Sequence, residues 1–187
     1  MISKINKLLY NEIFLKFFQI IYNSIKIIFY VISLAICSKL KFYLPFSPVP
    51  FTFQTMMIFL IIFFETKNLA FISIFSYIIC GSLGIPVFSH SNGFSNLLGP
   101  TGGYILGFLF SSFLADEKIK FKSYFTLFIK GILSIFIIYL SGFLGLLRFI
   151  DAKKAFITGI LPFIFFDIYK LLLSIFIYSK IKFKGYN

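Results

Sequence analysis

Long apolar runs alternate along this chain with short clusters of lysine, arginine, aspartate and glutamate. A helix that crosses a bilayer needs about 20 mostly apolar residues, and somewhat fewer when neighbouring helices and loops complete the crossing. Six runs meet or approach that length, at residues 22–42, 51–65, 68–83, 102–116, 124–148 and 155–179. The pattern predicts an all-α integral membrane protein, a bundle of six transmembrane helices, with residues 1–187 in a single domain.

Composition supports membrane embedding and excludes one other reading of a basic chain. Hydrophobic residues make up 59% of the sequence and charged residues 13%, whereas a soluble domain is usually about 25% charged. The formal net charge of +12 could indicate nucleic-acid binding. Here, however, the lysines flank apolar runs and form no stripe on a soluble face. We therefore expect contact with membrane lipid and none with nucleic acid.

The distribution of basic residues predicts the orientation of the chain. If residues 1–21 form a cytoplasmic segment and six spans follow, ten basic residues fall inside and five outside. The inner set is Lys4, Lys7, Lys16, Lys67, Lys118, Lys120, Lys122, Lys180, Lys182 and Lys184, and the outer set is Lys39, Lys41, Arg148, Lys153 and Lys154. Since cytoplasmic loops carry an excess of lysine and arginine, both termini are predicted to be cytoplasmic.

Two connections differ from ordinary solvated loops. Residues 83–104, LGIPVFSHSNGFSNLLGPTGGY, contain no charged residue and are rich in Gly, Ser, Asn and Pro. Residues 45–54, PFSPVPFTFQ, hold three prolines within six residues, which stiffen the backbone. Irregular backbone at a membrane is tolerated where it is buried in protein or lines a cavity. On the predicted topology both loops lie outside, so we expect them to cap a ligand cavity; a packed turn without ligand is the alternative.

Asp167 and Lys170 lie in the middle of the last apolar run. Asp167 alone among the six acidic residues falls in the interior of a predicted span, the others lying at span ends or in connections. A carboxylate in mid-span costs about 2.5–3.5 kcal/mol on insertion scales. Lys170 follows three residues later, so both side chains project from one helix face. Intramembrane charges face the bundle interior and often mark a substrate path. A salt bridge that only fixes packing is the alternative.

The rest of the chain does not indicate catalysis. His90 is the single histidine, and Cys37 and Cys80 lie in apolar runs without metal-ligand spacing. There is no GxxxxGK[ST] phosphate loop, so uphill transport would need the ATPase of another protein or an ion gradient. No enzyme activity, metal or cofactor is expected. Gln54 and Tyr104 are candidate ligand contacts, with a helix–helix hydrogen bond and interfacial anchoring as their respective alternatives.

Four blocks of the sequence resemble a known family. They read PFSPVPFTFQT, GSLGIPVFS, LLGPTGGYILGF and LPFIFFDIYK, and they cover residues 45–57, 81–108 and 159–170 in family order. On these blocks the chain resembles the BioY family, the biotin-specific substrate-binding S components of energy-coupling-factor transporters. The resemblance implies a six-helix fold with the cavity beneath the first and third loops, in a bacterial cytoplasmic membrane.

The resemblance also implies the ligand, the partners and the site. The chain would capture biotin and deliver it inward together with a transmembrane coupling subunit and two ATPase subunits. Asp167 and Lys170 match the acid and lysine of the family's last-helix motif, and Asn92 is the candidate for its loop amide. Biotin carries a carboxylate and a ureido ring, which a lysine and an aspartate can bind; which charge meets which end stays open. The expected substrate-binding residues are Asp167, Lys170, Asn92, Tyr104, Gln54, Phe88, Gly102 and Gly103.

Two features depart from the family pattern. The family usually has Pro-Gly immediately before the acid, where this chain has Phe165 and Phe166, so the last helix is expected to run straight past the acid. An AxxxA face on the first helix contacts the coupling subunit in the family; here its nearest equivalent is Ser33 and Cys37, which still allows close approach. An S component for another small vitamin or precursor, and a structural membrane protein without ligand, are the alternatives.

Overall fold

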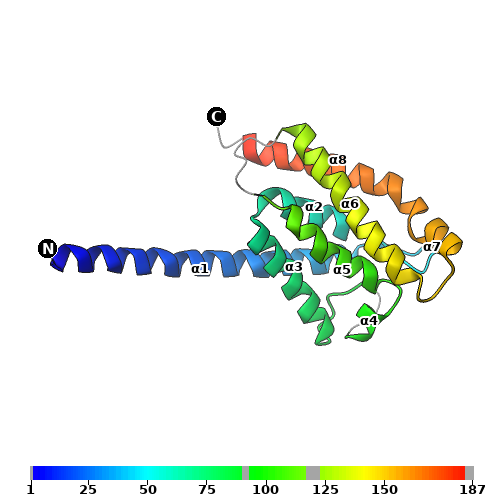
Figure 1. Ribbon diagram of the computed structural model, residues 1–187, viewed down its shortest axis with the longest axis horizontal. Helices are drawn as coiled ribbons and strands as arrows, with labels where there is room; N and C mark the ends of the chain where they lie inside the picture. Colours follow the sequence, from blue (N-terminus) through cyan, green and yellow to red (C-terminus); the bar gives the residue numbers. More distant parts are fainter. Residues whose placement is uncertain (1, 90–92, 117–122, 184–187) are drawn as a thin grey trace.

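The computed structural model describes residues 2–89, 93–116 and 123–183. Its regular structure is almost entirely helical, as the apolar pattern predicts (Figure 1). The helices are α1 (Ile2–Lys39), α2 (Gln54–Phe64), α3 (Lys67–Ser82), α4 (Ser95–Leu98), α5 (Gly102–Ser111), the 3-10 helix η1 (Ser112–Leu114), α6 (Tyr124–Leu146), α7 (Ala152–Gly159) and α8 (Leu161–Phe183). Two short strands, β1 (Lys41–Phe42) and β2 (Phe51–Thr52), pair antiparallel.

Three segments of the described chain are long and apolar enough to cross a membrane: Glu12–Lys39, Tyr124–Leu146 and Ala152–Lys182. The remaining apolar helices, α2, α3 and α5 with η1, have 10–17 residues. At 1.5 Å per residue they reach about 15–26 Å, which is less than the hydrocarbon core of about 30 Å. A helix is therefore present at each of the six predicted runs, but only three segments are long enough by themselves to cross a membrane.

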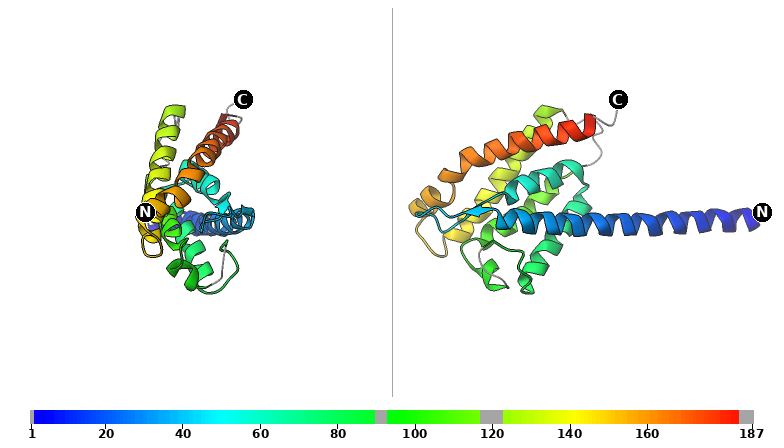
Figure 2. Two further views of the ribbon diagram at one scale, coloured as in Figure 1. Left: turned by 90° about the vertical axis from the view of Figure 1, so that its right-hand side faces the viewer. Right: turned by 180° about the vertical axis from the view of Figure 1, so that it is seen from behind.

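The first two predicted runs differ from the structure at their starts. α1 begins twenty residues before the predicted run 22–42, because no proline or glycine interrupts it, and its N-terminal half projects from the other helices (Figures 1 and 2). α2 begins at Gln54 and not at residue 51. Pro48 and Pro50 keep the preceding chain extended, and Phe51–Thr52 then pairs with β1.

The last predicted run, 155–179, is two helices and not one. Pro162 has no N–H to donate to the carbonyl of Thr158, and the helix breaks at Ile160, between α7 and α8. Two side chains satisfy the carbonyls that the break exposes. The Ser47 hydroxyl donates to the Thr158 oxygen, and the Tyr104 hydroxyl donates to the Gly159 oxygen, both at 2.8 Å. After the break α8 runs unbroken through the acid at 167, as expected without Pro-Gly.

Helices α5 and α6 approach each other closely through glycine. A Cβ on Gly103 would lie 2.4 Å from the Ser141 carbonyl oxygen, and one on Gly107 would lie 2.8 Å from the Ile138 Cα. Across the contact, Gly145 faces Gly103. Small residues four apart allow membrane helices to pack backbone to backbone. This contact places the start of α5 against the second half of α6.

The core lies where α2 meets α5, α6 and α8. The side chains of Ile58, Phe59, Ile61 and Ile62 in α2 are fully buried. α2 packs mainly along α8, while α1 packs along α3 (Figure 1). Because α2 is enclosed on several sides, the polar residues at its N-terminal end face protein and not lipid.

Candidate ligand-binding site

A pocket with about 510 Å³ of empty volume lies between β2, α2, α5, α6 and α8. Pockets for small ligands usually have a mostly apolar lining with a few polar groups. The lining residues are Val49, Pro50, Thr52, Gln54, Thr55, Ser89, Thr101, Tyr104, Ile105, Phe108, Ile138, Tyr139, Phe163, Asp167 and Lys170. Both unusual loops contribute, the first through Val49 and Pro50 and the second through Ser89 and Thr101.

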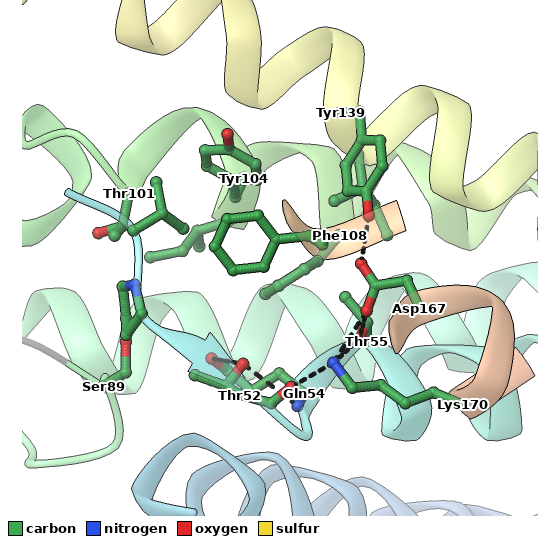
Figure 3. A pocket seen from close by; sticks show the side chains of 15 residues that line it. Thr52, Gln54, Thr55, Ser89, Thr101, Tyr104, Phe108, Tyr139, Asp167 and Lys170 are labelled. Carbon is green, nitrogen blue, oxygen red and sulfur yellow. Dashed lines mark hydrogen bonds and ion pairs between the residues drawn. The ribbon is translucent and has the colours of Figure 1, made fainter. Parts of the chain in front are cut away.

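Asp167 accepts three hydrogen bonds at one end of this pocket (Figure 3). Its Oδ1 accepts from the Thr55 hydroxyl and from the Lys170 ammonium, each at 2.8 Å. Its Oδ2 accepts from the Tyr139 hydroxyl at 2.7 Å. The carboxylate, which is only 3% exposed, is thereby joined to α2, α6 and its own helix.

Lys170 donates to three acceptors. Its Nζ lies 2.8 Å from Asp167 Oδ1, 2.7 Å from the Thr52 carbonyl oxygen and 3.1 Å from Thr55 Oγ1. The ammonium also lies 4.0 Å from the ring centroid of Phe51, within the range of a cation–π interaction. The pair is neutral as a whole, which offsets the cost of burying either charge.

The two members of the pair differ in their remaining hydrogen-bonding capacity. An ammonium has three protons, and each proton of Lys170 has an acceptor. A carboxylate has about four lone-pair sites, of which Asp167 uses three. The site can therefore accept a further donor from a ligand at Asp167 without breaking a bond, whereas contact with Lys170 would displace an existing partner.

Two further predicted residues line the pocket. Gln54, 4% exposed, donates through Nε2 to the Tyr77 hydroxyl at 2.7 Å and accepts from the Thr52 hydroxyl at 3.3 Å. Tyr104 presents its ring to the pocket while its hydroxyl is held by the Gly159 carbonyl. The sequence interpretation left Tyr104 open between ligand contact and interfacial anchor; the residue is 93% buried, so it does not lie at an exposed interface.

Three other predicted residues lie away from the pocket lining. Phe88 is 1% exposed and packs edge-to-face on Tyr77, with ring centroids 5.4 Å apart. Gly102 lies under the Leu97 carbonyl, and Gly103 lies against α6. None of the three is among the residues that line the pocket. Asn92, the candidate loop amide, lies outside the described residues, as does His90.

Sequence reasoning missed Tyr139 and Thr55, the two hydroxyl donors to Asp167. A signal was available for the first, because a tyrosine in the middle of an apolar span needs a partner for its hydroxyl. Thr55 directly follows Gln54 in the proline-rich block and was visible only as part of that block. Within the described ranges, no three His, Cys, Asp or Glu side chains gather as a metal site would require.

Comparisons with known proteins agree with one another. Residues 12–185 match the model of the BioY family. The chain is 40% identical over 137 residues to the probable biotin transporter BioY of Pyrococcus horikoshii, covering 73% of this chain and 82% of that protein. It is 34% identical over 145 residues to the biotin transporter BioY of Thermotoga maritima, covering 74% and 84%. The probable biotin transporter BioY of Rickettsia prowazekii is 31% identical over 182 residues, covering 94% and 93%.

The fold also matches a solved structure. The crystal structure at 2.1 Å of the S-component for biotin from an ECF-type ABC transporter superposes with a TM-score of 0.79. The match covers 88% of this chain and 92% of that chain, at 24% identity. It therefore supports the arrangement of the helices, while the family assignment rests on the sequence matches.

Proposed function

Because this chain belongs to the BioY family, we propose that it is the biotin-binding S component of an energy-coupling-factor transporter. It captures biotin at the outer face of the membrane and does not itself catalyse a reaction. Its partners are a transmembrane coupling subunit and two ATPase subunits. The ATPase subunits supply energy by hydrolysing ATP, since this chain has no GxxxxGK[ST] phosphate loop of its own. The observation that carries the proposal is the pocket with the Asp167–Lys170 pair at one end.

The proposed topology has six spans in the bacterial cytoplasmic membrane, with both termini in the cytoplasm. The excess of inner lysines supports this orientation. Tilting and outer loops compensate for the short α2, α3 and α5. The first and third loops then lie outside, above the pocket that Val49 and Ser89 line. We propose that these loops cap the bound ligand.

The spare hydrogen-bonding capacity of the site suggests how biotin lies in it. Asp167 accepts a ureido N–H, since it is the member of the pair with a free lone-pair site. The carboxylate of biotin lies at the other end, near Ser89 and Thr101 (Figure 3). There the Lys41 ammonium already contacts the Ser89 carbonyl oxygen, so a cation is close to that end. Lys170 acts by pairing with Asp167 and orienting its carboxylate.

The middle of the pocket suits the apolar part of biotin. Phe108 and Tyr104 lie between the two ends (Figure 3), and Ile138 and Phe163 also line the pocket. Such a lining encloses the thiophane ring and the hydrocarbon chain while leaving polar contacts to the two ends.

Isothermal titration of the detergent-purified chain with biotin tests the proposal. We expect saturable one-site binding of biotin. Prior addition of a chemically unrelated vitamin should leave that binding unchanged. Stronger competition by another vitamin would identify an S component of different specificity. No binding of any candidate by a folded protein would favour a structural role for the Asp167–Lys170 pair.

A further inference from the structure

Tyr139 also lines a second hollow, which is separate from the ligand pocket. This hollow has an empty volume of about 570 Å³, and we call it the α6–α7 groove. Its lining residues are Phe136, Tyr139, Leu140, Phe143, Phe156 and Ile160. The lining is apolar apart from the Tyr139 hydroxyl, which donates to Asp167. One aromatic ring thus borders the ligand pocket and the groove.

The groove lies at the break between α7 and α8. Ile160 lies at the break itself, and Phe156 lies one turn before it. The residues that border the groove remain open: Phe136 is 63% exposed, and Leu140 and Phe156 are each 47% exposed. Both contributing helices belong to segments that are long and apolar enough to span a membrane. Large apolar side chains exposed on such helices face lipid.

A lysine follows the groove toward the outer end of these helices. Lys153 precedes Phe156 by three residues, so both share one face of α7. Lys153 is exposed, and it lies at the start of the apolar segment Ala152–Lys182. The groove therefore has an apolar body within the membrane segment and a cation near the membrane surface.

The neighbouring charged residues leave the Lys153 ammonium available to bind an anion. Asp151 lies 3.3 Å from the Lys154 ammonium, and the Lys154 backbone N–H, donating to Asp151, holds the pKa of that carboxyl below its usual range. Asp151 is therefore ionised at neutral pH and engaged with Lys154. Within the described part of the chain, no carboxylate forms an ion pair with Lys153.

We propose that the α6–α7 groove binds one acyl chain of an anionic membrane phospholipid, whose phosphate contacts Lys153. From Phe136 to Phe143 the groove follows α6 for about 10 Å, enough for one segment of a chain. Because lipid tails are themselves apolar, packing holds the acyl chain, and the charge on Lys153 selects the headgroup. The lipid packs directly behind Tyr139, which holds the ligand-site carboxylate.

A lipid chain suits the groove better than a helix of another protein. Membrane helices approach each other through small residues, whereas phenylalanine, tyrosine, leucine and isoleucine line this groove. The groove also lies between two helices that already pack against each other. A flexible chain can enter such a space without moving either helix.

Native mass spectrometry of the purified chain tests the site, with phosphatidylglycerol or phosphatidylcholine added in matched detergent. We expect preferential retention of one phosphatidylglycerol. Lys153→Ala should lower that retention at least fivefold, to the level of phosphatidylcholine. Lys154→Ala is the matched control, since it removes the same charge from the next residue, and it should leave retention unchanged. Equal losses in both variants would show general surface attraction and overturn the proposal.

A second variant tests the apolar body of the groove. Leu140→Trp fills it and should lower retention of both lipids, whereas Leu133→Trp, at a similarly exposed position of the same helix outside the groove, should not. Thermal unfolding shows whether each variant is folded. Unchanged retention in folded Leu140→Trp, or a dimer that forms in place of the lipid adduct, would sink the proposal. The measurement needs no biotin, so its outcome is independent of the proposed transport function.

Discussion

Two ion pairs with buried carboxylates have similar lengths in this protein and different surroundings. Asp167–Lys170 and Lys26–Glu65 each join a carboxylate and an ammonium at 2.8 Å, and each carboxylate belongs to a residue that is 3% exposed. The first pair lies within α8, three residues apart, and lines the ligand pocket. The second joins α1 to the residue that ends α2, and it lines neither the pocket nor the groove.

The difference indicates what each pair does. Lys26–Glu65, to which the Tyr30 hydroxyl also donates, fastens α1 to the end of α2. The N-terminal half of α1 projects from the bundle, whereas the part that carries Lys26 is joined to α2 by this contact (Figure 2). Asp167–Lys170 also bonds to α2 and α6, but unlike Lys26–Glu65 it does so where it lines a pocket. Its burial is costly, so its place in a pocket argues for a role in ligand binding.

The largest contrast should come from neutralising each pair completely. In Asp167→Asn with Lys170→Met, the new amide can still accept from Tyr139 and donate to Thr55, so the fold is retained. We expect biotin affinity to fall at least hundredfold, about 2.8 kcal/mol, with the unfolding temperature within a few degrees of wild type. The matched double variant Lys26→Met with Glu65→Gln should keep biotin affinity. Titration calorimetry measures the biotin affinity and thermal unfolding the stability of each double variant. Equal losses of affinity in the two would contradict a specific role of the Asp167–Lys170 pair in ligand binding.

Single substitutions in the pocket pair should have the next largest effect. Asp167→Asn removes the free acceptor and leaves the Lys170 charge without its counterion, so biotin affinity should fall at least tenfold, about 1.4 kcal/mol. Lys170→Ala should do the same by disturbing Asp167. Asp151→Asn, which changes the exposed carboxyl that caps the start of α7, is the control. Undiminished binding by both pocket variants would remove these residues from the site.

Breaking the other pair should affect stability only. Glu65→Gln weakens the hydrogen bonds from Lys26 and Tyr30 and should lower the free energy of unfolding by about 1–3 kcal/mol. Biotin affinity should stay within twofold of wild type. Lys154→Ala, which removes an exposed pair, should change stability much less. A loss of affinity in stable Glu65→Gln would mean that the α1–α2 contact is coupled to the ligand pocket.

The smallest expected effect concerns the tyrosine beside each pair. Tyr139→Phe removes one of three hydrogen bonds to Asp167 and should weaken biotin binding two- to tenfold, about 0.5–1.5 kcal/mol. Tyr30→Phe removes the corresponding bond to Glu65 and should leave biotin binding unchanged. Parallel titrations of the two variants compare them directly. If Tyr30→Phe weakened binding as much, the hydroxyl of Tyr139 would have no specific part in the site.

Much of the helical framework could be predicted from the sequence. Apolar runs between charged clusters indicated where helices lie, and the proline-rich block indicated an extended chain before α2. The break at Ile160 was missed because Pro162 sits in an otherwise continuous apolar run. Its effect depends on Ser47 and Tyr104, distant residues that satisfy the exposed carbonyls.

The candidate site could be predicted only in part. The cost of a mid-span carboxylate singled out Asp167 and Lys170, and both line the pocket. Phe88 and the glycine pair at 102–103 belong to the right blocks, but their contacts are with Gly81, Leu97 and α6. A motif shows that a residue is needed at a position, and it does not separate a need for packing from contact with a ligand.

Membrane embedding, the family and the buried charges of α8 were thus determined by the sequence alone, because composition, periodicity and local motifs are properties of neighbouring residues. The tertiary structure decided which of the two carboxylates, Asp167 or Glu65, lines a pocket. It also decided that Tyr139, 28 residues from its partner in the chain, holds Asp167. Those contacts join separate helices. How such helices pack depends on residues from several segments and cannot be read from the sequence of one segment.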